Sequence, residues 1–190
     1  MLCKLEQESL SRVGRQFGQP LGDDYVGDPV SEAAITGAAL VRHLDDVRFA
    51  TLRALRQLLR ALDAERIAIG VLSPDGERIQ EELVWVSGFG RCGESERVVS
   101  CASFSDELRG WLASRDDAVS IGIDARSAAW HDLPCDQLLL VRSRIAERGL
   151  PSQVLVAQLR GGVRLPDSAA HAITILLKEY AVRRASVPGE

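Results

Sequence analysis

The sequence predicts an α/β domain of the α+β type, in which helices flank a central antiparallel sheet of five to six strands. Over residues 31–63, apolar side chains recur with the spacing of an α-helix. From residue 66 the spacing changes to every second residue, in short stretches separated by turn-forming residues. Helical spacing returns after Pro166. We therefore expect a long N-terminal helix, a sheet built from hairpins, and a C-terminal helix.

The beginning of the chain divides into an arm and a helix. Residues 1–30 hold scattered Gly, Pro and Asp, and we expect them to form a mobile N-terminal arm. Residues 31–184 are expected to form a single domain that starts with one helix over 31–63, and residues 185–190 are expected to form a tail.

The helix over 31–63 has an apolar face wide enough to cover a sheet and still contact a second copy of the chain. We therefore predict a homodimer through this helix. The alternative is a helix that only covers its own sheet. The predicted dimer face comprises Leu40, Leu44, Val47, Leu55, Leu58 and Leu62.

Two hairpins are expected in the middle of the chain. Residues 66–72 have the pattern of a strand buried on both faces, and the turn Ser73–Gly76 leads to a returning strand at 78–87. The second hairpin is expected at 137–145 and 153–160; the alternative for 137–147 is a helix. The remaining expected elements are a loop at 88–102, a short helix at 103–114, a strand at 118–123, a loop at 124–135 and a final helix from 166 to about 184.

Composition and charge argue against several classes of protein. The net charge is −4 with a pI near 5.5, whereas nucleic-acid binding needs a basic face. No apolar run reaches the roughly 20 residues that span a bilayer, and the N-terminus lacks the order of a signal peptide. We therefore expect a cytoplasmic protein without membrane contact. The absence of asparagine and the excess of arginine over lysine indicate a GC-rich bacterial genome.

The sequence contains no pattern that predicts a metal site or a catalytic centre. Its four cysteines are expected to be reduced, and none forms a C-x-x-C pair or stands at zinc-ligand spacing from a histidine. Adjacent acidic residues at 45–46 and 116–117 point apart, and no phosphate-binding loop is present. We therefore expect no metal and no enzymatic activity.

The order of elements resembles that of the GAF family over about residues 40–184. The likeness lies in ERIAIGVLSPDGERIQEELVWVSG, in DELRGWLASRDDAVSIGI, and in LLLVRSRIAERGLPSQVLVAQLR followed by LPDSAAHAITILLKEYA. The resemblance implies an antiparallel sheet with helices on one side and a small-molecule pocket on the other, in a sensory module that often dimerises through its end helices. The chain departs from two branches of the family, because it lacks the asparagine of the cyclic-nucleotide pattern and the Cys-His anchor of bilin-binding members. The cofactor is therefore unknown, and the sequence requires none.

A pocket of this kind is expected beneath the loops 88–102 and 124–135. Its candidate residues combine aromatic rings with polar or titratable groups. They are Trp85, Phe104, Trp130, His131, Asp132 and Arg142, the last of which could face an anionic ligand. The alternatives are that the aromatic residues belong to the core and that His131 and Arg142 are solvated.

Three cysteines are candidates for thiol chemistry, namely Cys92, Cys101 and Cys135. A thiolate needs a nearby positive charge to be reactive, and Arg91 and Arg97 lie close in the sequence. The free-methionine-sulfoxide reductase of the GAF family uses loop cysteines, but the segment RCGESERVVSCAS does not match its glycine-rich motif. The alternative is that all three are ordinary buried or idle thiols.

The sequence therefore predicts a bacterial sensory or regulatory domain that acts on a signalling partner protein, with the binding of a small molecule left open. The first alternative is an interaction and dimerisation module without a ligand. The second is a thiol-based redox sensor or a methionine sulfoxide reductase.

Overall fold

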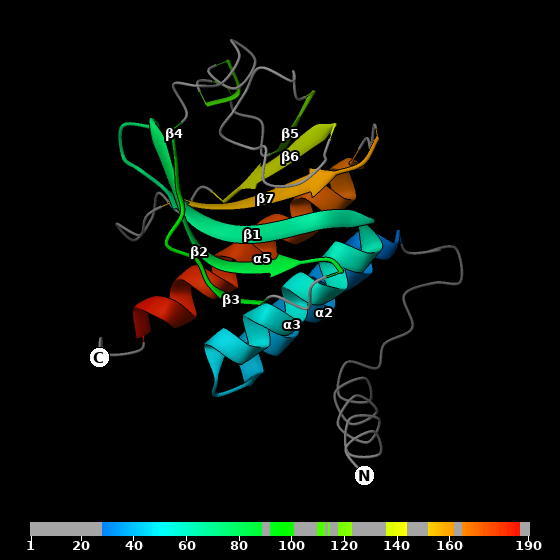
Figure 1. Cartoon of the computed structure of the whole chain (residues 1–190). Helices are drawn as coiled ribbons and strands as arrows, with labels where there is room; N and C mark the ends of the chain where they lie inside the picture. The colour runs from blue at the N-terminus through cyan, green and yellow to red at the C-terminus, as the bar shows by residue number, and fades with distance from the viewer. Residues whose placement is uncertain are drawn as a thin grey trace.

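The computed structural model describes residues 28–88, 92–100, 110–112, 114, 118–122, 136–143, 152–161 and 165–186 (Figure 1). The helices on one side of the sheet are α2 (Pro29–His43), α3 (Val47–Ala61) and α5 (Asp167–Ser186). The longer strands are β1 (Ala64–Leu72), β2 (Arg78–Val86), β5 (Ala118–Gly122), β6 (Gln137–Arg142) and β7 (Gln153–Leu159). Two short strands, β3 (Cys92–Glu94) and β4 (Val98–Ser100), follow β2.

The strands form one antiparallel sheet in the order β3-β2-β1-β7-β6-β5, with β4 paired to β2 as well. The α+β class and the antiparallel sheet are therefore confirmed. The two predicted hairpins are present as β1–β2 and β6–β7. The segment over 137–142 is a strand rather than a helix, because it pairs with β5 on one side and β7 on the other.

The sheet has seven strands rather than five or six, because the segment predicted to be a loop at 88–102 contributes β3 and β4. Each of these strands has three residues, which is too short for an alternating apolar pattern to be visible. They form because the outer edge of β2 offers unpaired backbone groups, and the segment after β2 folds back onto that edge.

The single helix predicted over 31–63 is instead two helices. Leu44 has an extended backbone (φ −87°, ψ 140°), and α3 begins at Val47 after Asp46. The Asp46 carboxylate accepts a 2.8 Å hydrogen bond from the backbone N–H of Phe49. Such a cap satisfies a donor of the first turn that has no partner within the helix, so the chain can start a new helix here.

The first helix begins inside the stretch predicted as a mobile arm. The Asp28 carboxylate accepts hydrogen bonds from the backbone N–H groups of Val30 (3.2 Å) and Ser31 (3.0 Å), and Pro29 occupies the first helical position. The remainder of the predicted arm, residues 1–27, lies outside the described residues.

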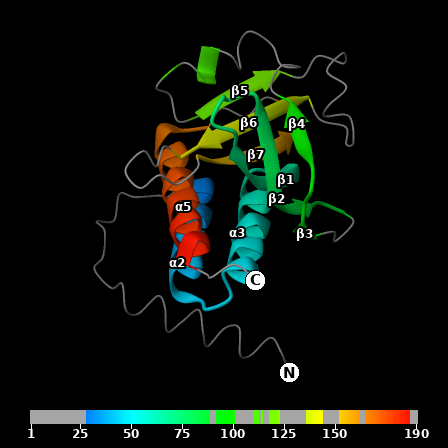
Figure 2. The ribbon, with the colours of Figure 1, turned by 90° about the vertical axis from the view of Figure 1, so that its left-hand side faces the viewer.

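The helices are arranged in two layers beneath the sheet (Figures 1 and 2). α3 packs against β1 and β2, α5 packs against β6 and β7, and α2 packs against both of these helices. α2 and α3 approach closely at Gly37, where an added Cβ would lie only 2.7 Å from the Cβ of Ala54.

Each face of the sheet has its own apolar cluster. The helix-side core includes Ile67, Ile69, Leu155 and Leu176, together with the inner faces of the three helices. A second cluster lies on the opposite face, which we call the distal face. It comprises Ile79, Val99, Trp111, Ile121, Leu138, Leu140, Val154 and Val156. Within the described ranges, none of the helices is long and apolar enough to cross a membrane.

Candidate functional site

Arg66 and Glu81 form a buried ion pair on the distal face. Nη1 of Arg66 donates a 2.7 Å hydrogen bond to Oε1 of Glu81, and Nη2 makes a second, parallel contact with Oε2. Arg66 is 6% exposed and Glu81 is 1% exposed. A bidentate guanidinium–carboxylate pair is among the strong hydrogen-bonded arrangements of side chains, and such groups are rarely buried unless they are paired.

The alternation of the strands explains how two charges come to lie on this face. Ile67 and Ile69 belong to the helix-side core, so Arg66 points to the other side of β1. Along β1, Ala68 and Gly70 follow Arg66 on the same face, and Glu81 is the register partner of Gly70. These small residues leave room above the sheet for the two long side chains to meet.

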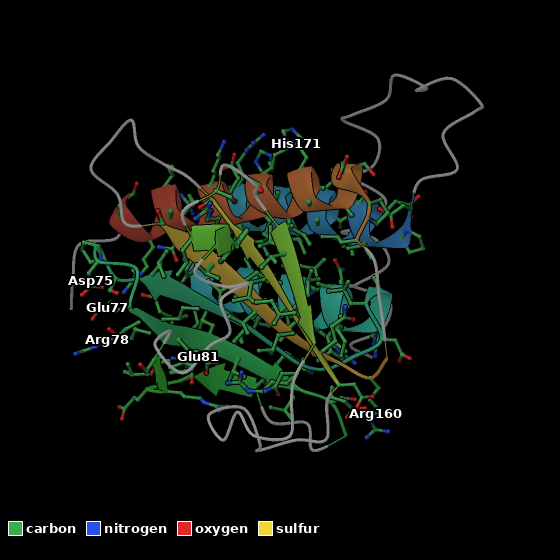
Figure 3. All side chains as sticks on the ribbon, turned by 90° about the horizontal axis from the view of Figure 1, so that it is seen from above. Asp75, Glu77, Arg78, Glu81, Arg160 and His171 are labelled. Carbon is green, nitrogen blue, oxygen red and sulfur yellow. The ribbon has the colours of Figure 1, made fainter. Side chains whose placement is uncertain are left out.

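Further polar groups surround the pair. The Ser95 hydroxyl, in the connection between β3 and β4, donates a 3.0 Å hydrogen bond to Oε2 of Glu81. Gln158 of β7 is buried and is the register partner of Arg66. We call Arg66, Glu81, Ser95 and Gln158 the distal polar cluster. Figure 3 views the molecule from above and shows Glu81 between Arg160 and the end of the β1–β2 hairpin that carries Asp75, Glu77 and Arg78.

The cluster is a fixed arrangement of charged and polar groups, most of them buried, in which Arg66 and Ser95 both contact Glu81. A buried ion pair contributes little net stability, because the desolvation of both charges offsets their attraction. It does present charged donors and acceptors in a fixed geometry, and these can bind a polar molecule with directional specificity. Among the described residues, no group of three or more His, Cys, Asp or Glu could hold a metal ion.

Arg142, predicted to face an anionic ligand, instead anchors a short helical segment around Trp111. Its guanidinium donates hydrogen bonds to three backbone carbonyl oxygens, those of Leu112 (3.0 Å), Trp111 (2.9 Å) and Ser114 (2.6 Å). It also lies over the Trp111 ring, at 4.6 Å from the ring centroid. Arg142 is buried rather than solvated, and the contacts described here are with the protein itself.

Trp85 lies on the opposite face from the distal polar cluster. It is half-buried, packs against the helix-side core, and carries the Arg56 guanidinium 5.6 Å from its ring centroid. This position matches the alternative of a core residue. Cys92 is exposed on β3, where it is the register partner of Trp85.

The other predicted site residues lie outside the described residues. They are Phe104, Trp130, His131 and Asp132 of the ligand-binding set, and Cys101 and Cys135 of the thiol set. Their roles stay predictions.

The residues predicted to form a dimer face lie in the protein's own interior. Leu55, Leu58 and Leu62 are buried in the helix-side core, as is Val47, and Leu40 and Leu44 pack against it. The four residues Val47, Leu55, Leu58 and Leu62 help to cover the sheet, which is the alternative considered for this helix, whereas Leu40 and Leu44 lie on α2 and its C-terminal cap. Homodimerisation stays a prediction, and the four buried side chains are not a free surface for it.

The sequence reasoning overlooked the distal polar cluster. The available signal was an arginine at the start of a strand that otherwise reads as buried on both faces, with small residues at every second position after it. That pattern places a cation on a buried face and so requires a buried acidic partner, which β2 supplies.

The comparisons with known proteins bear on the fold. No family model matches the chain, and no curated protein is similar to it. Solved structures do match. A phycocyanobilin-bound GAF domain from a cyanobacterial phytochrome aligns with a TM-score of 0.59 at 10% identity, over 84% of this chain and 96% of that one. The GAF domain of an Acinetobacter phosphoenolpyruvate-protein phosphotransferase gives 0.59 at 12% identity, over 84% and 96%.

A third similar structure is an enzyme. The free methionine-R-sulfoxide reductase of Neisseria meningitidis, in complex with its substrate, aligns with a TM-score of 0.56 at 11% identity, over 83% of this chain and 92% of that one. Identities this low establish a shared fold and no shared activity. The GAF-like fold that the sequence resemblance implied is therefore confirmed.

Proposed function

From this GAF-like fold, we propose that the chain is a sensory or regulatory domain that binds a small polar molecule on the distal face of its sheet and acts on a partner protein. The observation that supports it is the buried pair of Arg66 and Glu81, with the Ser95 hydroxyl on the same carboxylate. Two of the similar structures were solved with a small molecule bound, a bilin in one and a sulfoxide substrate in the other.

The position of the pair favours ligand binding over a purely structural role. Much of the rest of the distal face is apolar, with branched aliphatic residues on β6 and β7, and Arg142 adds a second buried cation there. A fully apolar face would give at least the same stability, because replacing a buried ion pair by apolar residues is often neutral or stabilising. Retaining a guanidinium and a carboxylate here is therefore best explained by recognition of a molecule with complementary polar groups.

The thiol and enzymatic alternatives have less support. Cys92 is the one candidate cysteine within the described residues, and it stands on the exposed edge strand β3, across from Trp85 rather than beside the distal polar cluster. We therefore propose a non-enzymatic role, in the cytoplasm of a bacterium, as the sequence predicted.

The test is thermal unfolding of the reduced protein against a panel of nucleotides, amino acids and carboxylic acids. A ligand at a hundred times its dissociation constant adds about 2.7 kcal/mol, which raises the unfolding midpoint by roughly 5–10 °C for a domain of this size. Glu81→Gln, which keeps the shape of the side chain and removes its charge, should lose most of that shift.

Glu94→Gln is the matched control, because Glu94, on the edge strand β3, forms an exposed ion pair with Arg48 of α3 (2.8 Å). It should keep the full shift. A panel without any shift would contradict the ligand proposal and favour an interaction module without a ligand. An equal shift in the wild type and in Glu81→Gln would place the ligand elsewhere.

A further inference from the structure

Two neighbouring glutamates of β2 bind partners on opposite faces of the sheet. Glu81 pairs with Arg66 on the distal face. Glu82 faces the helices, where the Tyr180 hydroxyl donates a 3.0 Å hydrogen bond to its Oε2 and Arg184 forms an ion pair with its Oε1. The distal polar cluster and the C-terminal turns of α5 are therefore connected through one peptide bond.

A β-bulge creates this arrangement. Ile69 of β1 pairs with Leu83, whereas the next residue, Gly70, pairs with Glu81. Glu82 is therefore the additional residue of β2, and the strand bends at this point.

The backbone around the bulge is held closely on both sides. A Cβ on Gly70 would lie 2.4 Å from a carbonyl oxygen of β2, so the two strands are in direct contact there. On the other side, the Glu81 N–H donates to the Arg97 carbonyl and the Ser95 N–H donates to the Glu82 carbonyl, each at 2.9 Å. We therefore expect a displacement of Glu81 to reach Glu82, because β1 on one side and the β3–β4 connection on the other hold this backbone.

The same turns of α5 also hold the end of α2. Arg183 donates a 2.9 Å hydrogen bond from Nη2 to the carbonyl oxygen of Leu44, which ends α2, and Glu179 forms an ion pair with Arg42. If the contacts of Glu82 with α5 weaken, we therefore expect the contacts of α5 with the α2–α3 connection to weaken as well.

The contacts of Glu82 with α5 stabilise the docked helix, but the cost of desolvating the Glu82 carboxylate offsets part of that stabilisation. Burial raises the pKa of Glu82, and the charge of Arg184 and the hydrogen bond from Tyr180 counter this effect only in part. The net contribution of these Glu82 contacts to the docking of α5 is therefore smaller than their geometry alone suggests.

We propose that the Glu81–Glu82 step transmits the state of the distal polar cluster to α5. A ligand that draws Arg66 away from Glu81 shifts the bulge, weakens the contacts of Glu82 with Tyr180 and Arg184, and releases the last turns of α5. The proposal rests on the proposed function only for the entry of a ligand, since the link itself is a property of the chain alone.

Amide hydrogen exchange of the ligand-free protein tests the link. Glu81→Gln weakens the pair with Arg66 as a ligand would, and it should speed exchange of the α5 amides over 178–186 by about tenfold, which corresponds to about 1.4 kcal/mol of local opening. The amides over 169–176 should change by less than about threefold, because the N-terminal half of α5 does not contact β2's glutamates. Glu94→Gln should leave both halves at their wild-type rates. Equal acceleration of the two halves, or no acceleration over 178–186, would overturn the proposal.

A double-mutant cycle is a second test, which distinguishes a specific link from a general loss of stability caused by Glu81→Gln. Tyr180→Phe removes the hydrogen bond to Glu82 from the other side. Each substitution changes the equilibrium constant for unfolding by some factor. If the two sites are linked, the factor for the double variant Glu81→Gln with Tyr180→Phe should differ from the product of the two single factors by more than about threefold. If they are independent, the two values should agree within about twofold. Should Glu81→Gln fail to fold, Tyr180→Phe alone must speed exchange of the Glu81 and Ser95 amides by about threefold or more, because coupling is reciprocal. Unchanged rates at these amides would then overturn the link.

Failure of this link and failure of the proposed function have different signatures. The exchange measurements use no ligand. If no ligand shifts the unfolding midpoint but Glu81→Gln speeds exchange over 178–186, the ligand proposal is contradicted and the link stands. Suppose instead that the thermal shift by a ligand depends on Glu81 but that Glu81→Gln leaves amide exchange in α5 unchanged. The link would then be contradicted, and the binding site would stand.

Discussion

The Arg142 guanidinium lies 4.6 Å from the centroid of the Trp111 ring and also donates a 2.9 Å hydrogen bond to the carbonyl oxygen of the same tryptophan. One residue of β6 thus holds both the ring and the backbone of a segment more than 25 residues earlier in the chain. The Trp111 carbonyl also accepts hydrogen bonds from the backbone N–H (3.0 Å) and the hydroxyl (2.9 Å) of Ser114, and the guanidinium adds a cation at the end of this turn, where helix carbonyls favour positive charge. The position of Trp111 over the distal apolar cluster therefore depends on Arg142.

We predict that Arg142→Lys lowers the free energy of unfolding by about 2–3 kcal/mol, because an ammonium cannot reach three carbonyls from a buried position as the planar guanidinium does. Urea unfolding followed by circular dichroism measures the change. Arg160→Lys is the matched control, since Arg160 forms an exposed ion pair with Glu65 (2.9 Å), and it should change stability by less than about 0.5 kcal/mol. Equal effects of the two substitutions would contradict the structural role of Arg142.

The ion pair of the distal polar cluster should show a characteristic non-additivity. Arg66→Met leaves Glu81 buried without its partner and should cost about 3–5 kcal/mol. The double variant Arg66→Met with Glu81→Leu removes both charges and should be more stable than the single variant. Urea unfolding of the three proteins decides the matter. A double variant markedly less stable than the wild type would show that the pair contributes net stability, and it would weaken the case for recognition.

Much of the fold follows from local patterns in the sequence. The change from helical to alternating spacing predicted the β1–β2 hairpin, and the final helix was predicted within a few residues of its observed limits. Strands as long as β1 and β7 carry enough residues for the periodicity of their buried side chains to be unambiguous.

The misplaced elements depend on signals that periodicity does not contain. The helical spacing of apolar residues continues through Leu44 and Val47, so it gives no sign of the boundary between α2 and α3. That boundary depends on the Asp46 side chain, which caps the start of α3. β3 and β4 form because the β2 edge is available, and edge pairing is a property of the assembled sheet.

The site was the least predictable part. Aromatic and titratable residues were chosen by type, yet Trp85 faces the helices and Arg142 binds backbone carbonyls. Arg66 and Glu81 meet only because the hairpin register and a bulge bring them to the same face, and the sequence alone does not fix the position of a bulge.

The contact between α2 and α3 should tolerate a methyl group on either helix but not on both. Gly37→Ala places a Cβ 2.7 Å from that of Ala54, so the helices must separate, and we expect a loss of about 1–3 kcal/mol despite the higher helix propensity of alanine. Adding Ala54→Gly moves the methyl group to the other helix and should restore much of the loss. Thermal or urea unfolding of the single and double variants checks this expectation. A stabilised Gly37→Ala protein would show that the helices are not in tight contact.

Tyr180 gives the protein a stability term that disappears in alkaline solution. Burial, and then the negative charge of Glu82, raise the pKa of the Tyr180 hydroxyl above its ordinary value of 10.0. Above that value the unfolded chain loses its phenolic proton before the folded protein does, so the folded state binds more protons and stability falls as the pH rises.

The difference in unfolding free energy between the wild type and Tyr180→Phe isolates this term, because the other alkaline groups are common to both proteins. At about pH 8 the wild type should be more stable by about 1 kcal/mol through the hydrogen bond to Glu82. By about pH 10.5 the advantage should shrink by roughly 0.5–1 kcal/mol, as expected for a tyrosine that ionises only in the unfolded chain. Urea unfolding at several pH values between these limits measures the difference. A constant advantage across the range would mean that Tyr180 ionises equally in both states, and that its hydroxyl is neither buried nor held against the Glu82 carboxylate.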